Sequence, residues 1–175
     1  TSPHLNLSRR SACAALLLAA AGPLWAQDGG GAFAVQDFEW TDDSRQRAVP
    51  VRLYLPRAAG PAGVGVRVPL VVFSHGIGGS RRGYSYLGQH WASHGIASLH
   101  LQHVGSDRNL WFGNPLGLVG RLQDAAQERE AIERPRDLSF ALDQLLASPV
   151  GERIDTKRIV AAGHSYGANT TLLAA

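Results

Sequence analysis

Residues 158–167 read Arg-Ile-Val-Ala-Ala-Gly-His-Ser-Tyr-Gly, and this stretch decides the fold. Its first half, up to Ala162, is apolar enough for a buried strand, and the residues after Gly167 continue as a helix. A sharp turn between such a strand and helix needs glycine on both sides of the central serine, because a Cβ there would clash. Gly163 and Gly167 therefore predict that Ser165 is a nucleophile on a strained turn. The alternative is an ordinary serine in a tight turn.

A nucleophilic serine also needs fixed N–H donors for the negative charge that develops on the substrate oxygen. The Tyr166 N–H lies at the start of the expected helix, where the helix dipole adds positive potential. The glycine-rich loop His75–Gly79 follows the unbroken apolar run Leu70–Phe73, and we assign the second donor to its Ile77 N–H. Gly76 would allow the close approach. The alternative is a plain strand-to-helix turn, and a phosphate loop is disfavoured because no Gly-Lys-Ser/Thr follows.

Outward from these two motifs, strands alternate with helices along the chain. The second strand shows the alternation of a sheet with one buried face, whereas Leu70–Phe73 runs without alternation, as a strand covered on both faces does. We expect strands at residues 33–40, 48–55, 70–73, 96–101 and 158–162, and helices at 80–94, after Pro135 and after Ser165. Two strands followed by βαβαβα, with no internal repeat, predict an α/β fold whose mostly parallel sheet is covered by helices on both faces.

The helix before the last strand carries a stripe of apolar residues with a helical period. Its members are Leu138, Ala141, Leu142, Leu145 and Leu146. A long polar helical region precedes the stripe. Since proline is favoured in the first turn of a helix, Pro135 predicts that the helix begins near Arg134 and Asp137. We expect these two charges to form an ion pair at the helix start.

The composition is that of a single soluble α/β domain. The chain has 175 residues, 45% hydrophobic and 18% charged, with a net charge of +3, which excludes disordered, collagen-like and coiled-coil chains. No apolar run reaches the roughly 18 to 20 residues of a membrane-spanning helix. The basic residues are scattered among acidic ones, so we expect no nucleic-acid partner.

The first 26 residues have the pattern of an export signal. Arg9 and Arg10 precede an apolar stretch at residues 12–21, and Ala26 supplies a small residue for cleavage. A buried helix is the alternative, which the flanking charges and the following Gly-Pro disfavour. We expect a signal peptide at 1–26, a linker at 27–32 and a domain at 33–175. The protein would then be secreted or periplasmic, by an export route that stays open.

Removal of this signal would leave 15 basic and 14 acidic residues, and so a net charge of +1. It would also remove the single cysteine, Cys13, so the mature chain would have no disulfide and no thiol nucleophile. A lipid-anchor site would want an aliphatic residue three positions before Cys13, where Arg10 stands. We therefore expect no stable membrane anchor.

Two further groups of residues invite a functional interpretation. His90 and His94 are spaced as in zinc-binding helices, but no third ligand is evident, so we expect a simple helix-face pair and no metal ion or cofactor. A polar, aromatic loop is expected above the carboxyl edge of the sheet, where ligands bind in α/β proteins. Substrate contact and plain surface packing both stay open for its residues Asp107, Trp111, Phe112 and Asp124.

With both motifs placed, the chain resembles the α/β-hydrolase superfamily over residues 33–175. The resemblance rests on Val71–Gly76, on Gly163–Gly167 and on the helix between them. Residues 47–56 are also similar to a strand of the dienelactone-hydrolase-like and platelet-activating-factor-acetylhydrolase-like group, which neighbours the cutinase-like polyester hydrolases. The resemblance implies a serine esterase that acts on small or lipid-like esters. True dienelactone hydrolases use a cysteine nucleophile, so their lactone specificity does not carry over.

The sequence departs from this superfamily in length. The acid and the general-base histidine of the family follow the nucleophile in chain order, whereas this sequence ends ten residues after Ser165 and all its histidines precede it. We therefore expect it to be the N-terminal portion of a longer enzyme, inactive by itself. The first hypothesis is a secreted serine hydrolase that cleaves carboxylic esters. The alternative is a non-catalytic binding protein on the same fold.

Overall fold

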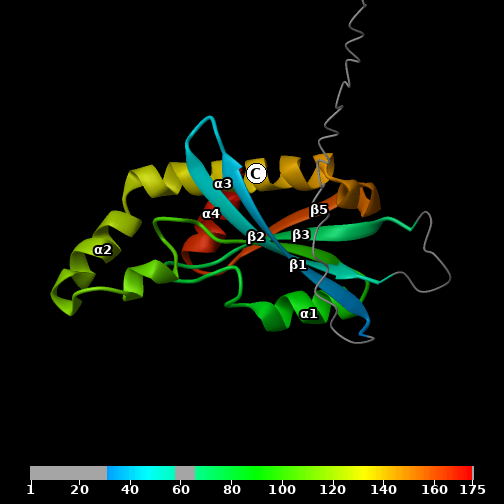
Figure 1. Ribbon diagram of the computed structural model, residues 1–175, viewed down its shortest axis with the longest axis horizontal. Helices are drawn as coiled ribbons and strands as arrows, with labels where there is room; N and C mark the ends of the chain where they lie inside the picture. Colours follow the sequence, from blue (N-terminus) through cyan, green and yellow to red (C-terminus); the bar gives the residue numbers. More distant parts are fainter. Residues whose placement is uncertain (1–30, 58–65, 175) are drawn as a thin grey trace, which may run out of the picture.

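A single five-stranded sheet organises the part of the chain that the structure describes. The computed structural model describes residues 31–57 and 66–174, so the expected signal peptide and nearly all of the expected linker lie outside the described residues. The strands are β1 (Phe33–Asp42), β2 (Arg47–Pro56), β3 (Val68–Ser74), β4 (Ala97–Leu101) and β5 (Ile154–Gly163). Their spatial order is β1-β2-β4-β3-β5 (Figure 1).

The sheet combines an antiparallel hairpin with a parallel half. β1 pairs with β2 in an antiparallel register, and β2 pairs antiparallel with β4. β3 lies between β4 and β5 and is parallel to both. Parallel neighbours need crossover connections, and helices supply them here. The expected order of two strands followed by alternating strands and helices is confirmed.

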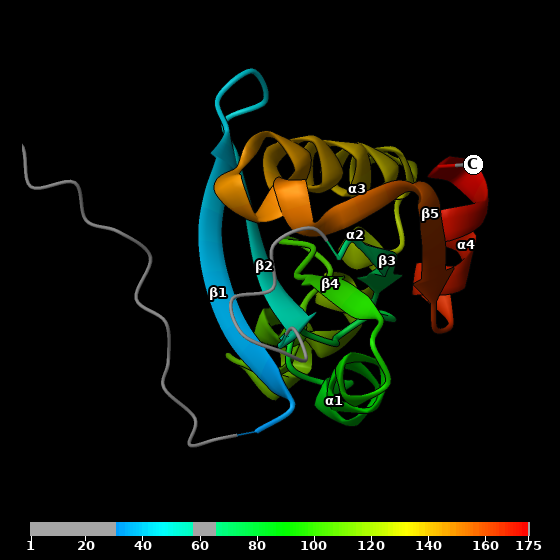
Figure 2. The same ribbon diagram turned by 90° about the vertical axis from the view of Figure 1, so that its right-hand side faces the viewer.

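Helices cover both faces of the sheet. They are α1 (Ser85–Ser93), α2 (Leu118–Ala125), α3 (Glu128–Ala147) and α4 (Tyr166–Ala174), with short 3₁₀ helices η1 (Arg108–Trp111), η2 (Pro115–Gly117) and η3 (Pro149–Arg153). Figure 2 shows α1 on one side of the sheet and α3 and α4 on the other. None of the described helices is both long enough and apolar enough to cross a membrane.

Helix α1 begins five residues later than the sequence predicts. Residues 81–84 form turns, and the helix starts at Ser85. The Arg81 side chain turns back to the N-terminal hairpin, where it donates to the carbonyl oxygens of Phe38 and Val51 and pairs with Glu39. These tertiary bonds hold the segment in a non-helical path.

The prediction that the helix before β5 begins near Arg134 is wrong. Helix α3 begins at Glu128, and Pro135 lies inside it. An internal proline removes one helix hydrogen bond and costs about 3 kcal/mol in an isolated helix. In this helix Glu130 and Arg134 before the proline are buried, as is Asp137 after it. Tertiary bonds on both sides of the proline therefore hold the helix together.

The core lies between the sheet and α3. All five residues of β4 are buried, including the polar Ser98 and His100, because the strand is covered on both faces. Leu138, Ala141 and Leu145 of the predicted stripe are buried against β2, β3 and β4. Because β3, β4 and β5 are parallel, their carboxyl ends lie at the same edge of the sheet. The loops that follow these three strands meet at that edge.

Candidate active site

Ser165 lies on the predicted turn between β5 and α4. Its φ is +54°, in the left-handed region that non-glycine residues rarely adopt. A Cβ added at Gly163 would lie 2.3 Å from the Gly167 backbone, and one added at Gly167 would lie 2.0 Å from the Ser74 carbonyl oxygen. Side chains are therefore excluded at both positions. The Ser165 residue between them is exposed.

The glycine-rich loop after β3 lies directly beside this turn. The His164 N–H donates to the Ser74 carbonyl oxygen at 3.2 Å, which joins the two segments. A Cβ added at Gly76 would lie 3.3 Å from the Ser165 Cβ and from the His164 carbonyl oxygen. The loop backbone thus lies close to the serine turn, and a side chain at Gly76 would make these neighbours shift by a few tenths of an ångström. The role of Gly76 in the site stays a prediction.

Hydrogen bonds to two carbonyl groups fix the directions of the backbone N–H groups of Ile77 and Tyr166. The Gly76 carbonyl accepts from the Gly79 N–H at 3.1 Å, and the Ser165 carbonyl accepts from the Ala168 N–H at 2.9 Å. Because a trans peptide points its C=O and N–H in opposite directions, the Ile77 and Tyr166 N–H groups face the other way. Among the described residues neither N–H has a protein acceptor. Their role as oxyanion donors stays a prediction.

The aromatic loop after β4 clamps the glycine-rich loop. The Gly78 N–H donates to the Ser106 carbonyl at 2.9 Å, and the Trp111 indole N–H donates to the Gly78 carbonyl at 2.8 Å. Trp111 and Phe112 are more than half exposed. Asp107 is buried instead, and caps η1 by accepting from the Asn109 N–H. Of the loop residues left open by the sequence, Trp111 bonds to the glycine-rich loop through its side chain, and the Asp107 backbone pairs with Gly79 in a short parallel bridge.

The Ser165 hydroxyl has no side-chain partner among the described residues, 31–57 and 66–174. The neighbouring His164 is exposed, and its Nδ1 lies 2.8 Å from the Tyr84 hydroxyl. His75, His100 and His103 are fully buried. No histidine of the described part is placed to take the Ser165 proton.

A buried chain of hydrogen bonds, which sequence reasoning missed, lies beneath the site. The Ser74 Oγ is 2.8 Å from the His103 Nε2, and the His103 Nδ1 is 3.0 Å from the Asp137 Oδ2. All three side chains are fully buried. Ser74 and His103 follow neighbouring parallel strands, so they meet at one edge of the sheet. Because both residues lie at the ends of strands that the sequence predicts, their proximity could have been predicted from the sequence.

Burial and nearby charges determine which atoms in this chain of hydrogen bonds carry the protons. Burial, with the nearby Arg134 charge, holds the pKa of His103 well below its usual range, so the ring is neutral. Its Nδ1–H then donates to Asp137, and its Nε2 accepts from the Ser74 hydroxyl. Burial also lowers the pKa of His75 to about 4. The His75 Nε2 accepts from the His103 N–H at 3.1 Å, so its Nδ1–H donates to the Gly76 carbonyl at 2.6 Å.

Arg134 and Asp137 do not form the predicted ion pair. Asp137 accepts from Arg45 at 3.0 Å and from Arg47 at 2.9 Å, both from the β1–β2 hairpin. Burial raises the pKa of Asp137, and the two arginines oppose that shift. Arg134 has neutral partners, described below. The two residues lie three positions apart on one helix, but they bond to different parts of the fold. Asp137 bonds to the N-terminal hairpin, whereas Arg134 bonds to the segments near Ser165.

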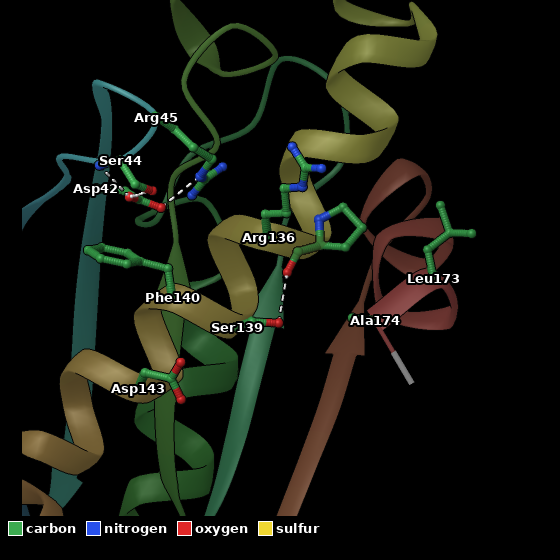
Figure 3. Close-up of a pocket in the computed structure, with 10 residues that line it drawn as sticks. Asp42, Ser44, Arg45, Arg136, Ser139, Phe140, Asp143, Leu173 and Ala174 are labelled. Carbon is green, nitrogen blue, oxygen red and sulfur yellow. Dashed lines mark hydrogen bonds and ion pairs between the residues drawn. The ribbon is translucent and has the colours of Figure 1, made fainter.

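The described residues contain no group of three or more side chains that could hold a metal ion. His90 and His94 are exposed on α1 with their ring centroids 4.3 Å apart. A hollow of about 660 Å³ lies between the β1–β2 turn, α3 and the end of α4 (Figure 3). Its lining includes Arg45, Phe140 and Leu173 but no residue of the serine turn or the glycine-rich loop. This hollow is therefore separate from the candidate site.

Sequence comparisons relate the chain to acetylhydrolases. The family model for platelet-activating factor acetylhydrolase, isoform II, matches residues 57–109. The platelet-activating factor acetylhydrolase of Cavia porcellus is 28% identical over 142 residues, which cover 64% of this chain and 33% of that protein. The chain thus spans about a third of the length of this relative.

Solved structures of esterases share the fold. A ferulic acid esterase from Streptomyces cinnamoneus superposes with a TM-score of 0.66 at 24% identity, covering 88% of this chain and 57% of that one. A dienelactone hydrolase from Anabaena variabilis superposes with a TM-score of 0.54 at 19% identity, covering 81% and 57%. The chain therefore has the α/β-hydrolase fold, and its sequence resembles the platelet-activating factor acetylhydrolases.

Proposed function

We propose that the protein is an exported serine hydrolase that cleaves carboxylic esters through an acyl-enzyme on Ser165. One observation carries the proposal: an exposed serine with φ of +54° lies beside the glycine-rich loop, and the Ile77 and Tyr166 N–H groups next to it have no protein acceptor in the described chain. The esterases and the acetylhydrolase that resemble the chain support it. Small or lipid-like esters are the proposed substrates.

The proposed reaction has two halves. The Ser165 Oγ attacks the ester carbonyl carbon, and its proton passes to a general base. The Ile77 and Tyr166 N–H groups receive the carbonyl oxygen as it becomes negative. The C–O bond to the alcohol then breaks, and the alcohol leaves with that proton. In the second half water attacks the acyl-enzyme, gives a proton to the same base, and releases the carboxylic acid as Ser165 regains its hydrogen.

The general base is expected outside the described residues, since the histidines near Ser165 are buried or bonded elsewhere. By the resemblance, an acid and a histidine would follow the nucleophile in chain order. Experiments on activity therefore need the full-length gene product.

The test is covalent labelling of that product with a fluorophosphonate, together with hydrolysis of p-nitrophenyl esters. We expect one adduct by intact mass and measurable turnover, both lost in Ser165→Ala by at least about 10³-fold. Ser139→Ala, an exposed serine of α3, is the matched control and should label normally. The same mass spectrum shows whether the exported chain begins at Gln27, as the proposed signal requires.

A folded wild-type protein with neither adduct nor turnover would overturn the proposal. It would favour the alternative of a binding protein on this fold. An adduct that persists in Ser165→Ala would move the nucleophile to another residue.

A further inference from the structure

Arg134 is a buried cation whose direct partners are neutral. Its side chain is fully buried in α3. The Nε donates to the Thr170 Oγ1 at 2.8 Å and the Nη1 to the Ser106 Oγ at 2.8 Å. The Nη2 donates to the Ser74 Oγ at 3.1 Å and also to the His75 carbonyl oxygen. Within the described chain, no carboxylate bonds directly to this guanidinium.

These partners belong to the segments that carry the candidate oxyanion donors. His75 begins the glycine-rich loop, two residues before Ile77. Thr170 is in the first turns of α4, which begins at Tyr166. The guanidinium carbon also lies 4.6 Å from the centroid of the Tyr166 ring, the distance of a cation–π contact. One planar group therefore touches both sides of the site.

The bonds from Arg134 lead to the Ile77 N–H through two peptide planes. Arg134 holds the His75 carbonyl, which fixes the first plane of the loop. The His75 ring and the Gly79 N–H hold the Gly76 carbonyl, which fixes the plane that carries the Ile77 N–H. On the other side, the Thr170 bond and the Tyr166 ring contact fix the first turns of α4.

The charge of Arg134 persists at working pH. Burial lowers its pKa to about 10, which still leaves the guanidinium protonated at neutral pH. Asp137, the nearest acid along the helix face, already accepts from Arg45 and Arg47. The candidate site thus lies next to a fixed positive charge that is itself buried, and a charge shielded from water acts more strongly on its neighbours than an exposed one.

We infer that Arg134 is the positioning residue of the oxyanion site: it sets the distance between the Ile77 and Tyr166 N–H groups and adds positive potential behind them. The inference rests on the proposed esterase function. It predicts an effect on the transition state and little effect on substrate binding, because Arg134 itself is buried and contacts no substrate.

The experiment compares Arg134→Met and Arg134→Lys with the wild-type full-length protein, using p-nitrophenyl esters and a boronic acid. A boronic acid forms a tetrahedral anion on the serine and so reports on the oxyanion site. Displacement of the two donors should lower kcat in Arg134→Met about 100-fold with KM changed less than about threefold. The boronic acid inhibition constant should rise by the same factor as kcat/KM falls. Arg134→Lys keeps the charge without the fork of donors, so it should recover only part of kcat.

Leu145→Ala is the matched control, because Leu145 is a fully buried residue of the same helix that faces the core. It should lose stability yet keep kcat and boronic acid affinity. If Arg134→Met does not fold, Thr170→Val and Arg134→Lys test the inference in its place, because each of them disturbs the same contacts less. We expect both to lower kcat at constant KM.

The inference is overturned if folded Arg134 and Thr170 variants keep the wild-type kcat and boronic acid affinity. It is also overturned if the losses match those of Leu145→Ala. An inactive, unlabelled wild-type protein would instead overturn the proposed function. Failure of the Arg134 inference and failure of the proposed function are therefore distinguishable.

Discussion

Two serines of this chain stand at the ends of neighbouring parallel strands in opposite circumstances. Ser74 ends β3, is fully buried, and has the distances of a Ser–His–Asp triad, 2.8 Å to His103 and 3.0 Å from His103 to Asp137. Ser165 follows β5, is exposed, and has a φ of +54° with no side-chain partner in the described chain. Distance alone would select Ser74 as the nucleophile, whereas the proposed function assigns that role to Ser165.

The difference teaches that a hydrogen-bonded trio is not enough to propose a nucleophile, because the serine also has to be accessible to substrate. No substrate reaches Ser74, and its oxygen already accepts a bond from Arg134. Strain at Ser165 persists only because the fold over-determines it, which is typical of functional positions. The buried trio uses the same chemistry for a structural purpose, to tie β3 and the loop after β4 to α3.

The largest expected effect is a loss of stability in acid, caused by protonation of the buried histidines. Burial lowers the pKa of His75 to about 4 and of His100 to about 3, against 6.5 for an ordinary histidine. At a pH between the folded and the unfolded pKa values, these rings bind protons in the unfolded chain but not in the folded one. The free energy of unfolding is therefore highest above about pH 6.5 and falls as the pH decreases below it. At pH 5 each ring should cost about 2 kcal/mol, and His103 acts in the same direction.

Urea unfolding at pH 7.5 and pH 5 measures this loss. The exposed His90 provides the control, since His90→Gln should keep the full pH dependence. A free energy of unfolding that stays constant over this window would mean that the buried rings bind protons as readily as those of the unfolded chain, which contradicts the lowered pKa values.

Removal of the Asp137 charge should be the next largest effect. Asp137→Asn leaves Arg45 and Arg47 without their shared buried carboxylate and takes away the acceptor for His103. Loss of one partner from a buried ionic cluster costs about 3 kcal/mol or more. The exposed Asp143 of the same helix is the matched site, and thermal unfolding should show Asp143→Asn unchanged. Equal melting temperatures for the two variants would contradict a structural role for the trio.

Release of the strain at Ser165 should have the smallest effect and the opposite sign. Ser165→Gly places a residue that accepts a positive φ freely, so it should raise the free energy of unfolding by about 1 kcal/mol while it abolishes labelling. Ser74→Ala should instead lower it, since Arg134 and His103 lose a buried partner. Chemical denaturation of both variants tests the contrast, which fails if Ser165→Gly is the less stable of the two.

The sequence predicts the parts of this molecule that depend on local patterns. The unbroken apolar run before His75 and the glycines at 163 and 167 locate β3, β5 and the serine turn, because these features reflect neighbouring residues alone. The order of strands and helices along the chain follows from the same patterns, whereas the spatial order of the strands in the sheet was not predicted. The roles of Ser165, Ile77 and Tyr166 stay predictions.

Long-range bonds account for what the sequence did not predict. Pro135 indicates a helix start by local rules, yet α3 continues through it because Glu130 and Arg134 are anchored by distant partners. Arg81 delays the start of α1 through bonds to the hairpin. The Ser74–His103–Asp137 chain joins three elements, and no spacing along the sequence announces it.

The cluster around Asp137 also has a consequence for the order of folding. Arg45 and Arg47 precede Asp137 by 92 and 90 residues, so the ribosome releases the hairpin long before α3 exists. Until then the two guanidinium groups have to stay in water, because burying them without their carboxylate is costly. The N-terminal hairpin therefore cannot dock in its final position ahead of α3. Docking of the hairpin during synthesis should therefore wait until residue 137 has emerged from the ribosome.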